Sequence, residues 1–457
     1  MAPSFDIIIV GAGIAGLGAS ISLVRAGHRV KILEAAPQLT EIGAGIQVPP
    51  NSVRLLSRLG VYDEVARLAT WPRKITIKRW QNGVEIGSTP LLPKMEETYG
   101  FPYFLIHRGD LHKVLLMKAQ EVGVDILTGS FVSSVDEDAC SITLDNGSVH
   151  TADLIVGADG IKSRVRKSLL GSGDVEIRPD PNCAYRTLIP GELMLQDPVL
   201  KPLIESPTAT CWIGHEGHVM AYPIRNGTLY NFVMCHPGSV PVGKPNENAP
   251  LDDMRARYKD WDPIITRLID IVPQCLKWQN AELEKFDDWS SKSGKVILIG
   301  DACHGMVPYM AQGAAMAIED GVTLTECLAR AESARDIPAL LRHFVDLRRD
   351  RCHIILDAAR NNGNIWHLPD GPQQEQRDQG MREGPKETIV ADQSTKVENP
   401  NRWSDPSFQP WMFGFDAYAE ANRYLDQHWN PSKDNLIDVG QRTGFLERSP
   451  AVTVATG

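Results

Sequence analysis

The chain has 457 residues, of which 42% are hydrophobic, and its formal net charge at pH 7 is −10. This length predicts two domains with ample buried surface, and the scattered positive charges argue against nucleic acid or an anionic membrane as the main partner. The first residues carry no basic leader and no apolar run is long enough to cross a bilayer, which predicts a cytoplasmic protein that binds small molecules.

A βαβ unit is predicted at the start of the chain. Residues 5–10 are a continuous β-branched run, as a strand buried on both faces requires, and residues 29–34 predict a second strand. Between them, residues 14–26 have the apolar spacing of a helix that stops at Gly27. Strand, helix and strand in this order are typical of a dinucleotide-binding domain.

The turn between the first strand and the helix reads "GAGIAG". Gly11 can make the tight turn, Gly13 lets the backbone approach a pyrophosphate, and Gly16 lets the helix sit close to the strand. The N-terminus of the helix would then face the phosphates. Glu34 ends the second strand, where an acid would accept hydrogen bonds from the adenosine ribose.

Strands of a different kind are predicted between these nucleotide-binding segments. Residues 75–88 predict a hairpin, and residues 208–235 predict three strands that turn at residues 216–217 and 226–227. These segments indicate an antiparallel sheet that covers the bound cofactor.

The register of the last two strands follows from the length of their turn. A two-residue turn makes Arg225 face Thr228 and pairs Tyr222 with Asn231. Alternation then places His218 and Tyr222 on one face. A phenol, an imidazole and an amide on an otherwise apolar sheet suit a pocket for an aromatic ring with polar substituents.

Two more buried strands are predicted at residues 153–158 and 295–299, and they deliver "GADG" and "GDACHGMVPYMAQG" at their carboxyl ends. Both ends fall where open α/β sheets bind ligands. A nicotinamide dehydrogenase needs neither segment, whereas the ribityl chain and ring of a flavin need further anchors. Asp301 is placed to bond a ribityl hydroxyl, and a helix that begins near Gln312 would point its positive end at the flavin ring.

The C-terminal part of the chain carries less information. Residues 338–360 predict a long helix with "LRRDR" on a solvated face, and Glu319 and Asp320 are assigned to a solvated helix face as well, with Cys303 as a small core residue. Eight cysteines without a CxxC pair or a zinc-like spacing predict reduced, buried thiols and no metal site. The tail residues Trp403, Trp411, Met412 and Phe415 are expected to dock on the body of the protein, with docking on a second subunit as the alternative.

Four motifs, in this order, resemble those of the class A FAD-dependent aromatic hydroxylases, particularly the salicylate hydroxylase-like branch. They are "GAGIAG" with Glu34, "HRGDL" at residues 107–111, "GADG" at 157–160 and "GDACH…P…QG…ED" at 300–320. The resemblance covers about residues 5–365. It implies an α/β fold in which a Rossmann-like FAD-binding domain carries an inserted, mostly antiparallel substrate domain and C-terminal helices.

The expected domain boundaries follow from these segments. Residues 1–75, 101–180 and 280–337 form the discontinuous FAD-binding domain, residues 76–100 and 181–279 the substrate-binding domain, and residues 338–457 a C-terminal helix and extension.

The resemblance also assigns cofactor contacts. It implies that Glu34 binds ribose, Arg108 the flavin side, Asp159 the phosphate region shared by FAD and NAD(P)H, and Asp301 the ribityl chain. The full set of predicted cofactor-binding residues is Gly11, Gly13, Gly16, Glu34, Arg108, Asp159, Gly160, Asp301, Pro308, Gly313 and Ala314.

The reaction implied by the resemblance is hydroxylation of an electron-rich phenolic small molecule, in secondary metabolism. NADH or NADPH reduces FAD, O2 adds to give a C4a-hydroperoxide, and the distal oxygen is transferred to the ring. Tyr222 and His218 are predicted to handle the phenol and Arg186 to bind an anion, with His304 beside the flavin and Gln47 in the segment that lines it. The chain is expected to be a monomer or a homodimer.

Other functions stay open at this point. They are epoxidation or oxidative dearomatisation of a larger aromatic or indole metabolite, a flavin dehydrogenase or oxidase, and a non-catalytic flavin-binding protein. A flavin-dependent halogenase shares the architecture, but the WxWxIP signature of that group is absent from the sequence.

Overall fold

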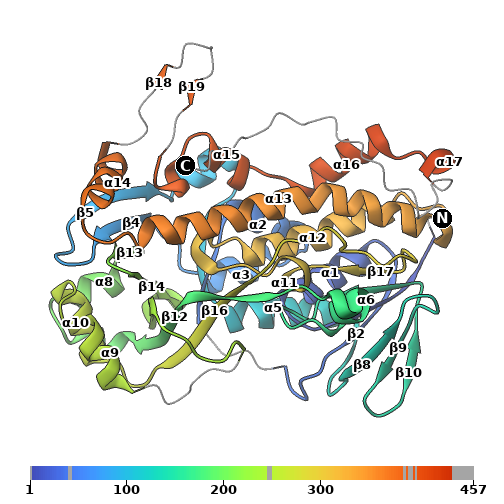
Figure 1. The fold of residues 1–457 in the computed structure, drawn as a ribbon, viewed down its shortest axis with the longest axis horizontal. Coiled ribbons are helices and arrows are strands. Elements are labelled where there is room, and N and C mark those ends of the chain that lie inside the picture. Colours follow the sequence, from blue (N-terminus) through green and yellow to red (C-terminus); the bar gives the residue numbers. More distant parts are fainter. Residues whose placement is uncertain are drawn as a thin grey trace.

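The structure is a computed structural model that describes residues 3–39, 44–243, 250–383, 388–389, 395–396 and 399–434. Its two largest sheets are a five-stranded and a seven-stranded one, and helices cover them in separate layers (Figure 1). The predicted α/β class is therefore confirmed. Among the described residues, no helix combines the length and the apolar character needed to cross a membrane.

The five-stranded sheet is wholly parallel and forms the predicted Rossmann-like core. Its order is β17 (Val296–Leu298), β11 (Leu154–Gly157), β1 (Asp6–Val10), β2 (Arg29–Leu33) and β7 (Asp125–Leu127). All four strands predicted from continuous apolar runs are present. The last four residues of β1 are buried, as a parallel strand between two helical layers requires.

Helix α1 (Ile14–Arg25) packs on this sheet, and α5 (Arg108–Glu121) and α12 (Gly313–Leu328) pack against α1. The crossing of α1 and α12 is close because Gly321 has no side chain: a Cβ there would lie 2.7 Å from the Cα of Ala19. The first residues of both helices and Asp301 of α11 (Asp301–His304) line the same cavity.

The seven-stranded sheet is antiparallel except for one parallel pair, β4 with β13. Its order is β16 (Leu276–Leu283), β12 (Ile177–Pro190), β15 (Leu229–Pro237), β14 (Gly217–Ile224), β13 (Thr208–Gly214), β4 (Lys74–Arg79) and β5 (Glu85–Pro90). Both predicted antiparallel segments are present. The sheet reaches beyond the expected 181–279 segment, because β12 continues through an irregularity between Pro179 and Cys183 and pairs with the end of β16.

The predicted pairing of Tyr222 with Asn231 is confirmed. The turn itself differs from the prediction, because the last pair is Ile224 with Leu229 and the connection is a short 3-10 turn. Arg225 has a positive φ of 48° and makes an ion pair at 2.7 Å with Asp110 of α5, rather than facing Thr228. The ion pair ties the hairpin to the nucleotide-binding core.

The C-terminal segment lies across the body. Helix α13 (Ile337–Trp366) runs along the molecule beside α12, and the segment that follows returns over it (Figure 1). Trp403 and Met412 are buried and Trp411 and Phe415 pack against the core, so the predicted docking on the body is confirmed. The helices of this segment are α14 (Pro372–Glu383), α15 (Phe408–Phe413), α16 (Ala417–His428) and α17 (Pro431–Asp434).

The remaining elements are smaller. They are β3 (Gly45–Val48), α2 (Pro50–Arg58), α3 (Tyr62–Leu68), α4 (Lys94–Tyr99), β6 (Phe104–His107), β8 (Val132–Asp136), β9 (Ser141–Leu144), β10 (Val149–Thr151), α6 (Arg164–Leu170), α7 (Gly191–Leu195), α8 (Lys201–Glu205), α9 (Leu251–Tyr258), α10 (Pro263–Asp270), β18 (Thr388–Ile389) and β19 (Thr395–Lys396). The eight cysteines are free and buried, as predicted.

One assignment in the helical layer was wrong. Glu319, Asp320 and Arg348 are fully buried and Arg351 nearly so, although the sequence pattern placed these charges on solvated faces. Arg348 bonds Glu319 at 2.7 Å and Asp320 at 2.8 Å, and Arg351 bonds Glu319 at 2.8 Å. Two cations and two anions neutralise one another between α12 and α13, which makes their burial tolerable.

Candidate active site

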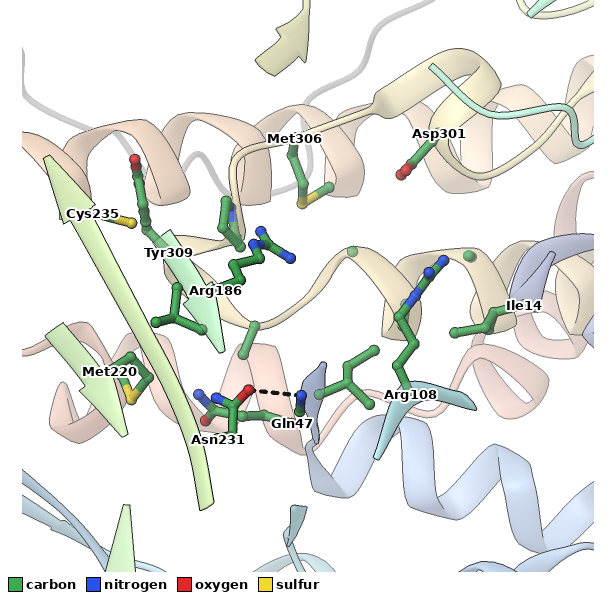
Figure 2. Close-up of a pocket in the computed structure, with 18 of the residues that line it drawn as sticks. Ile14, Gln47, Arg108, Arg186, Met220, Asn231, Cys235, Asp301, Met306 and Tyr309 are labelled. Carbon is green, nitrogen blue, oxygen red and sulfur yellow. Dashed lines mark hydrogen bonds between the residues drawn. The ribbon is translucent and has the colours of Figure 1, made fainter. Parts of the chain in front are cut away.

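A single cavity of about 350 Å³ lies between the carboxyl edge of the parallel sheet and one face of the seven-stranded sheet (Figure 2). It is lined by most of the predicted site residues: Gly13, Gln47, Arg108, Gly160, Arg186, His218, Tyr222, Asp301, Pro308, Gly313 and Ala314. The predicted residues outside its lining are Gly11, Gly16, Glu34, Asp159 and His304.

The three glycines of the first turn have three different surroundings. Gly11 has a φ of +102°, and a Cβ there would lie 2.5 Å from the carbonyl oxygen of Ala158. A Cβ at Gly16 would lie 2.0 Å from the carbonyl oxygen of Gly11, so the helix can approach the turn only without a side chain. A Cβ at Gly13 would meet no atom within 4 Å and would project into open space on the cavity side.

Glu34 and Asp159 lie at the ends of their strands but use their carboxylates locally. Glu34 accepts hydrogen bonds from the backbone nitrogens of Ala12 and Ala36, each at 2.8 Å. Asp159 accepts from the Ser163 hydroxyl at 2.5 Å and from the first amides of α6. The Asp159 side chain thus holds the start of α6, while its neighbours Ala158 and Gly160 line the cavity, and the predicted role of Asp159 in the phosphate region stays a prediction.

The middle of the cavity combines a carboxylate, a guanidinium and a helix N-terminus. Asp301 and Arg108 point into the same part of the cavity (Figure 2). Gly313 and Ala314, the first residues of α12, line the same space, so the positive end of the helix faces it. Ala311, just before this helix, adopts a left-handed φ of 55°, which turns the backbone toward the cavity.

At the far end, Arg186 is a partly buried cation that has no counter-ion among the described residues. It forms no ion pair with a carboxylate of the described residues, and its Nε has no hydrogen-bond partner there. Its Nη2 lies 3.5 Å from the Asn280 side-chain oxygen. Burial lowers the pKa of Arg186, but a guanidinium remains charged at neutral pH. Such a group could bind an anion in the cavity.

Tyr222 lies beside Arg186 and against the backbone of β3. A Cβ on Gly45 would lie 2.8 Å from the Tyr222 hydroxyl, and the Gly45 amide donates to Asn231 at 2.7 Å. Burial raises the pKa of Tyr222, and the charge of Arg186 opposes this shift. Gln47 accepts a hydrogen bond from the Tyr103 hydroxyl at 2.7 Å and faces the same end.

His218 completes this face of the sheet. It is 4% exposed and lines the cavity, and its Nδ1 lies 2.7 Å from Nε2 of His367. Burial lowers its pKa well below the ordinary value, so the ring is neutral. The predicted grouping of His218, Tyr222 and Arg186 around one space is therefore present.

His304 does not lie in the cavity, and the predicted position beside a flavin is corrected. It is fully buried, and its Nε2 lies 2.6 Å from the Asp320 carboxylate. The same oxygen of Asp320 accepts from the Gly300 amide, and the other bonds Arg348. Cys303, His304 and Asp320 are close enough to hold a metal ion, but these bonds and the adjacent guanidinium indicate a structural cluster.

Several cavity residues were not predicted from the sequence. Tyr309, Trp366 and Trp403 line the substrate end, and Trp403 comes from the C-terminal segment. Its indole nitrogen lies 3.4 Å from the Met310 carbonyl oxygen. Trp366 and Trp403 lie outside the quoted motifs, and only the docking of the tail brings Trp403 to the cavity.

Comparison with known proteins assigns the chain to a family. The family model described as FAD binding domain matches residues 4–359. The 3-amino-4-hydroxybenzoate 2-monooxygenase PtmB3 of Streptomyces platensis is 36% identical over 426 residues, which cover 91% of this chain and 98% of that protein. The chain belongs to the class A FAD-dependent aromatic hydroxylases. The FAD-dependent monooxygenase OpS4 of Beauveria bassiana is 35% identical over 418 residues, covering 91% of this hydroxylase and 96% of OpS4.

The fold of this hydroxylase is shared with solved structures. A crystal structure of CtdE in complex with FAD and a substrate superposes with a TM-score of 0.79 at 21% identity, covering 93% of this chain and 98% of that one. Membership of the family makes the protein a flavoprotein oxidoreductase. A bound FAD fits this cavity, because the cavity combines open space at Gly13, the N-termini of two helices and the carboxylate of Asp301.

The two glycine positions give a matched test. Gly16→Ala is expected to lower the free energy of unfolding by roughly 1–3 kcal/mol, because its Cβ would overlap the backbone of Gly11. Gly13→Ala should unfold like the wild type yet bind FAD more weakly, because the methyl group fills space expected for the pyrophosphate. Urea unfolding and FAD titration separate the two effects. Equal stability of both variants would contradict the close approach at Gly16.

Asp301→Ala is expected to keep the fold and to lower FAD affinity by roughly 10- to 100-fold, the effect of one lost hydrogen bond to a charged group. Asp270→Ala, an exposed carboxylate on α10, is the control and should bind FAD like the wild type. The measurement is the FAD dissociation constant by flavin fluorescence. Unchanged affinity in Asp301→Ala would show that the ribityl chain lies elsewhere.

Proposed function

We propose that this hydroxylase uses NADH or NADPH and O2 to hydroxylate a phenolic ring that carries a carboxylate. The observation that supports this most is the continuity of the cavity, which joins Gly13 at the dinucleotide end to Arg186 at the other, where the described residues supply no counter-ion. The name of the relative PtmB3 specifies an aminohydroxybenzoate, a ring with both a phenol and a carboxylate.

The bound FAD would supply the redox chemistry: it takes a hydride from NAD(P)H and activates O2 for transfer of one oxygen atom to the ring. Gly13, Asp301 and the N-terminus of α12 would hold it, and Arg108 would face the flavin from the opposite wall. The positive end of α12 would favour negative charge on the reduced ring system.

The residues of the seven-stranded sheet would bind and activate the substrate. Arg186 is expected to bind the carboxylate by paired, charge-assisted hydrogen bonds. Tyr222 and His218 would bond the phenol oxygen, which increases the electron density of the ring as that oxygen becomes more negative. Trp366 and Trp403 give the cavity an aromatic wall that excludes water from the reacting atoms.

A substrate screen tests the proposal. The FAD-loaded protein is mixed with NADH or NADPH and a panel of hydroxybenzoates, each matched with the phenol that lacks the carboxylate. We expect faster NAD(P)H oxidation and a product heavier by one oxygen atom only with the acids. Stimulation by the neutral phenols alone would contradict the role of Arg186. Oxidation that yields hydrogen peroxide and no oxygenated product from any compound would identify an oxidase.

A further inference from the structure

We propose that His367 fixes the ring of His218 so that His218 presents an Nε2–H donor, not a base, to the cavity. This inference rests on the proposed function, because a hydrogen-bond donor at this end of the cavity acts on a phenol only if a phenolic substrate binds there. The tautomer itself depends only on the hydrogen bonds of the protein. His367 follows α13 and lies outside residues 4–359, the part that the FAD-binding family model covers.

The two rings are joined in a well-aligned hydrogen bond. His218 Nδ1 and His367 Nε2 are 2.7 Å apart, the ring planes differ by only 14°, and the centroids are 5.0 Å apart. These values place the bond close to the plane of both rings, where the nitrogen lone pair lies. Since Nδ1 is used in this way, Nε2 is the nitrogen that His218 has left for the cavity it lines.

His367 itself is held on several sides. Its backbone nitrogen donates to Gly363 at 3.0 Å, and its carbonyl accepts from Glu216 at 3.3 Å. The ring of Tyr309 meets both histidines edge-on, with centroids 5.2 Å from His218 and 5.7 Å from His367. The pair is therefore a fixed unit between α13 and the hairpin of β13 and β14.

The direction of the hydrogen bond follows from the third member of the chain. Burial lowers the pKa of His218 and brings that of His367 to about 4, so each ring carries one proton at neutral pH. Nδ1 of His367 lies 3.3 Å from the side-chain nitrogen of Asn182, which can only donate. His367 therefore accepts a hydrogen bond on Nδ1 and carries its proton on Nε2, from which it donates to Nδ1 of His218. Because Nδ1 of His218 accepts this bond, His218 carries its own proton on Nε2.

Asp180 fixes the orientation of the Asn182 amide. The Asn182 side chain also donates a hydrogen bond to the Asp180 carboxylate, and the Asn182 backbone nitrogen donates to the same carboxylate at 2.7 Å. The Tyr309 hydroxyl donates to it at 3.2 Å. A carboxylate accepts only, so the amide must turn its NH2 group inward and the polarity of the whole chain is set.

A donor at His218 changes what the site does to a phenol. Together with the neighbouring cation Arg186, an Nε2–H donor on His218 would favour a substrate that binds with a negatively charged phenol oxygen. A base in this place would instead accept the phenol proton. His367 is thus a positioning residue, which acts through His218 without touching the substrate.

Nitrogen NMR of the FAD-loaded enzyme tests the tautomer directly, without a substrate. In ¹⁵N-histidine-labelled protein, the signals of His218 are identified by their loss in His218→Gln. We expect Nε2 of His218 to be protonated and Nδ1 to be unprotonated. His367→Phe should shift His218 toward the other tautomer. His367→Gln, whose amide NH2 can replace the donor, should restore the wild-type pattern, and His215→Phe, an exposed residue of the same hairpin, should leave it unchanged. A protonated Nδ1 in the wild type, or no change in His367→Phe, would overturn the inference.

The consequence for the substrate is measured with 3-hydroxybenzoate as a probe. At fixed pH, the ratio of phenolate to phenol in the bound probe, read from its absorbance, should fall on the order of tenfold in His367→Phe and recover in His367→Gln, the effect of one charge-assisted hydrogen bond. A confirmed tautomer with no binding of any hydroxybenzoate would contradict the proposed function and leave the role of His367 intact. An unchanged ratio in His367→Phe would overturn the consequence for the substrate.

Discussion

Arg186→Met is expected to lower product formation roughly a hundredfold or more while FAD stays bound and NAD(P)H is still consumed. Methionine keeps much of the apolar volume of the arginine side chain and removes a partly buried guanidinium whose Nε lacks a hydrogen-bond partner among the described residues. Without it, the substrate carboxylate is neither bound nor positioned, so the activated oxygen should be released as hydrogen peroxide. The measurement is product and peroxide formed per NAD(P)H consumed, with the best acid from the screen.

Arg178→Met is a matched control, since it lies on the same strand β12. The Arg178 side chain is 46% exposed and pairs with Glu284 on the surface. Surface pairs of this kind contribute little to stability, so this variant should keep wild-type coupling. Equal coupling in both variants would contradict the role of Arg186 and leave Tyr222 and His218 as the remaining candidates on this face.

The parts of the site that the sequence predicted are those fixed by local rules. The spacing of Gly11, Gly13 and Gly16 follows from one turn, and each has the surroundings expected of it. Strand alternation correctly placed His218 with Tyr222, because pairing with Asn231 fixes which side chains share a face. A different turn between these strands did not alter this result, since the register stayed the same.

The predictions failed where a residue depends on a partner distant in the chain. When α13 is considered alone, the charged sequence around Arg348 and Arg351 is typical of a helix face exposed to solvent. They are buried because Glu319 and Asp320 of α12 lie opposite, and a single helix cannot show that complementarity. His304 was placed beside the flavin because it follows a cofactor motif, but it bonds Asp320 of the same cluster.

The C-terminal segment shows a second limit. Trp403 and His367 follow no recognisable motif, and neither lies within the residues that the family model matches. Only the tertiary packing of the tail on the body brings them to the cavity and to His218.

Arg348→Met is expected to lower the free energy of unfolding by about 3–5 kcal/mol, because it removes a buried cation that both carboxylates share and leaves Glu319 with Arg351 and Asp320 with His304 as the remaining partners. Arg348 bonds both Glu319 and Asp320, and all three side chains are 0–1% exposed. Arg349→Met, one position along α13, is the control: its side chain is 22% exposed and pairs with Asp287 and Asp350 at longer range. This control should change stability by less than about 1 kcal/mol. Urea unfolding of the FAD-loaded proteins gives both values.

The pH dependence of the stability lost in Arg348→Met shows whether Arg348 stabilises the protein by its charge or by its packing. Burial alone would raise the pKa of Glu319 and of Asp320, but the facing cations hold both below their ordinary values. Depressed pKa values contribute stability that is present above the unfolded values, about 4, and is lost as pH falls through the folded ones. In Arg348→Met only His304 and the Gly300 amide still oppose the effect of burial on Asp320, so the pKa of Asp320 is expected to rise and its protonation to begin nearer neutrality. The stability difference from wild type should therefore narrow as pH is lowered from about 7 toward 5. A difference that stays constant over this range would show that Arg348 stabilises the protein by filling space between α12 and α13, not by neutralising the two carboxylates.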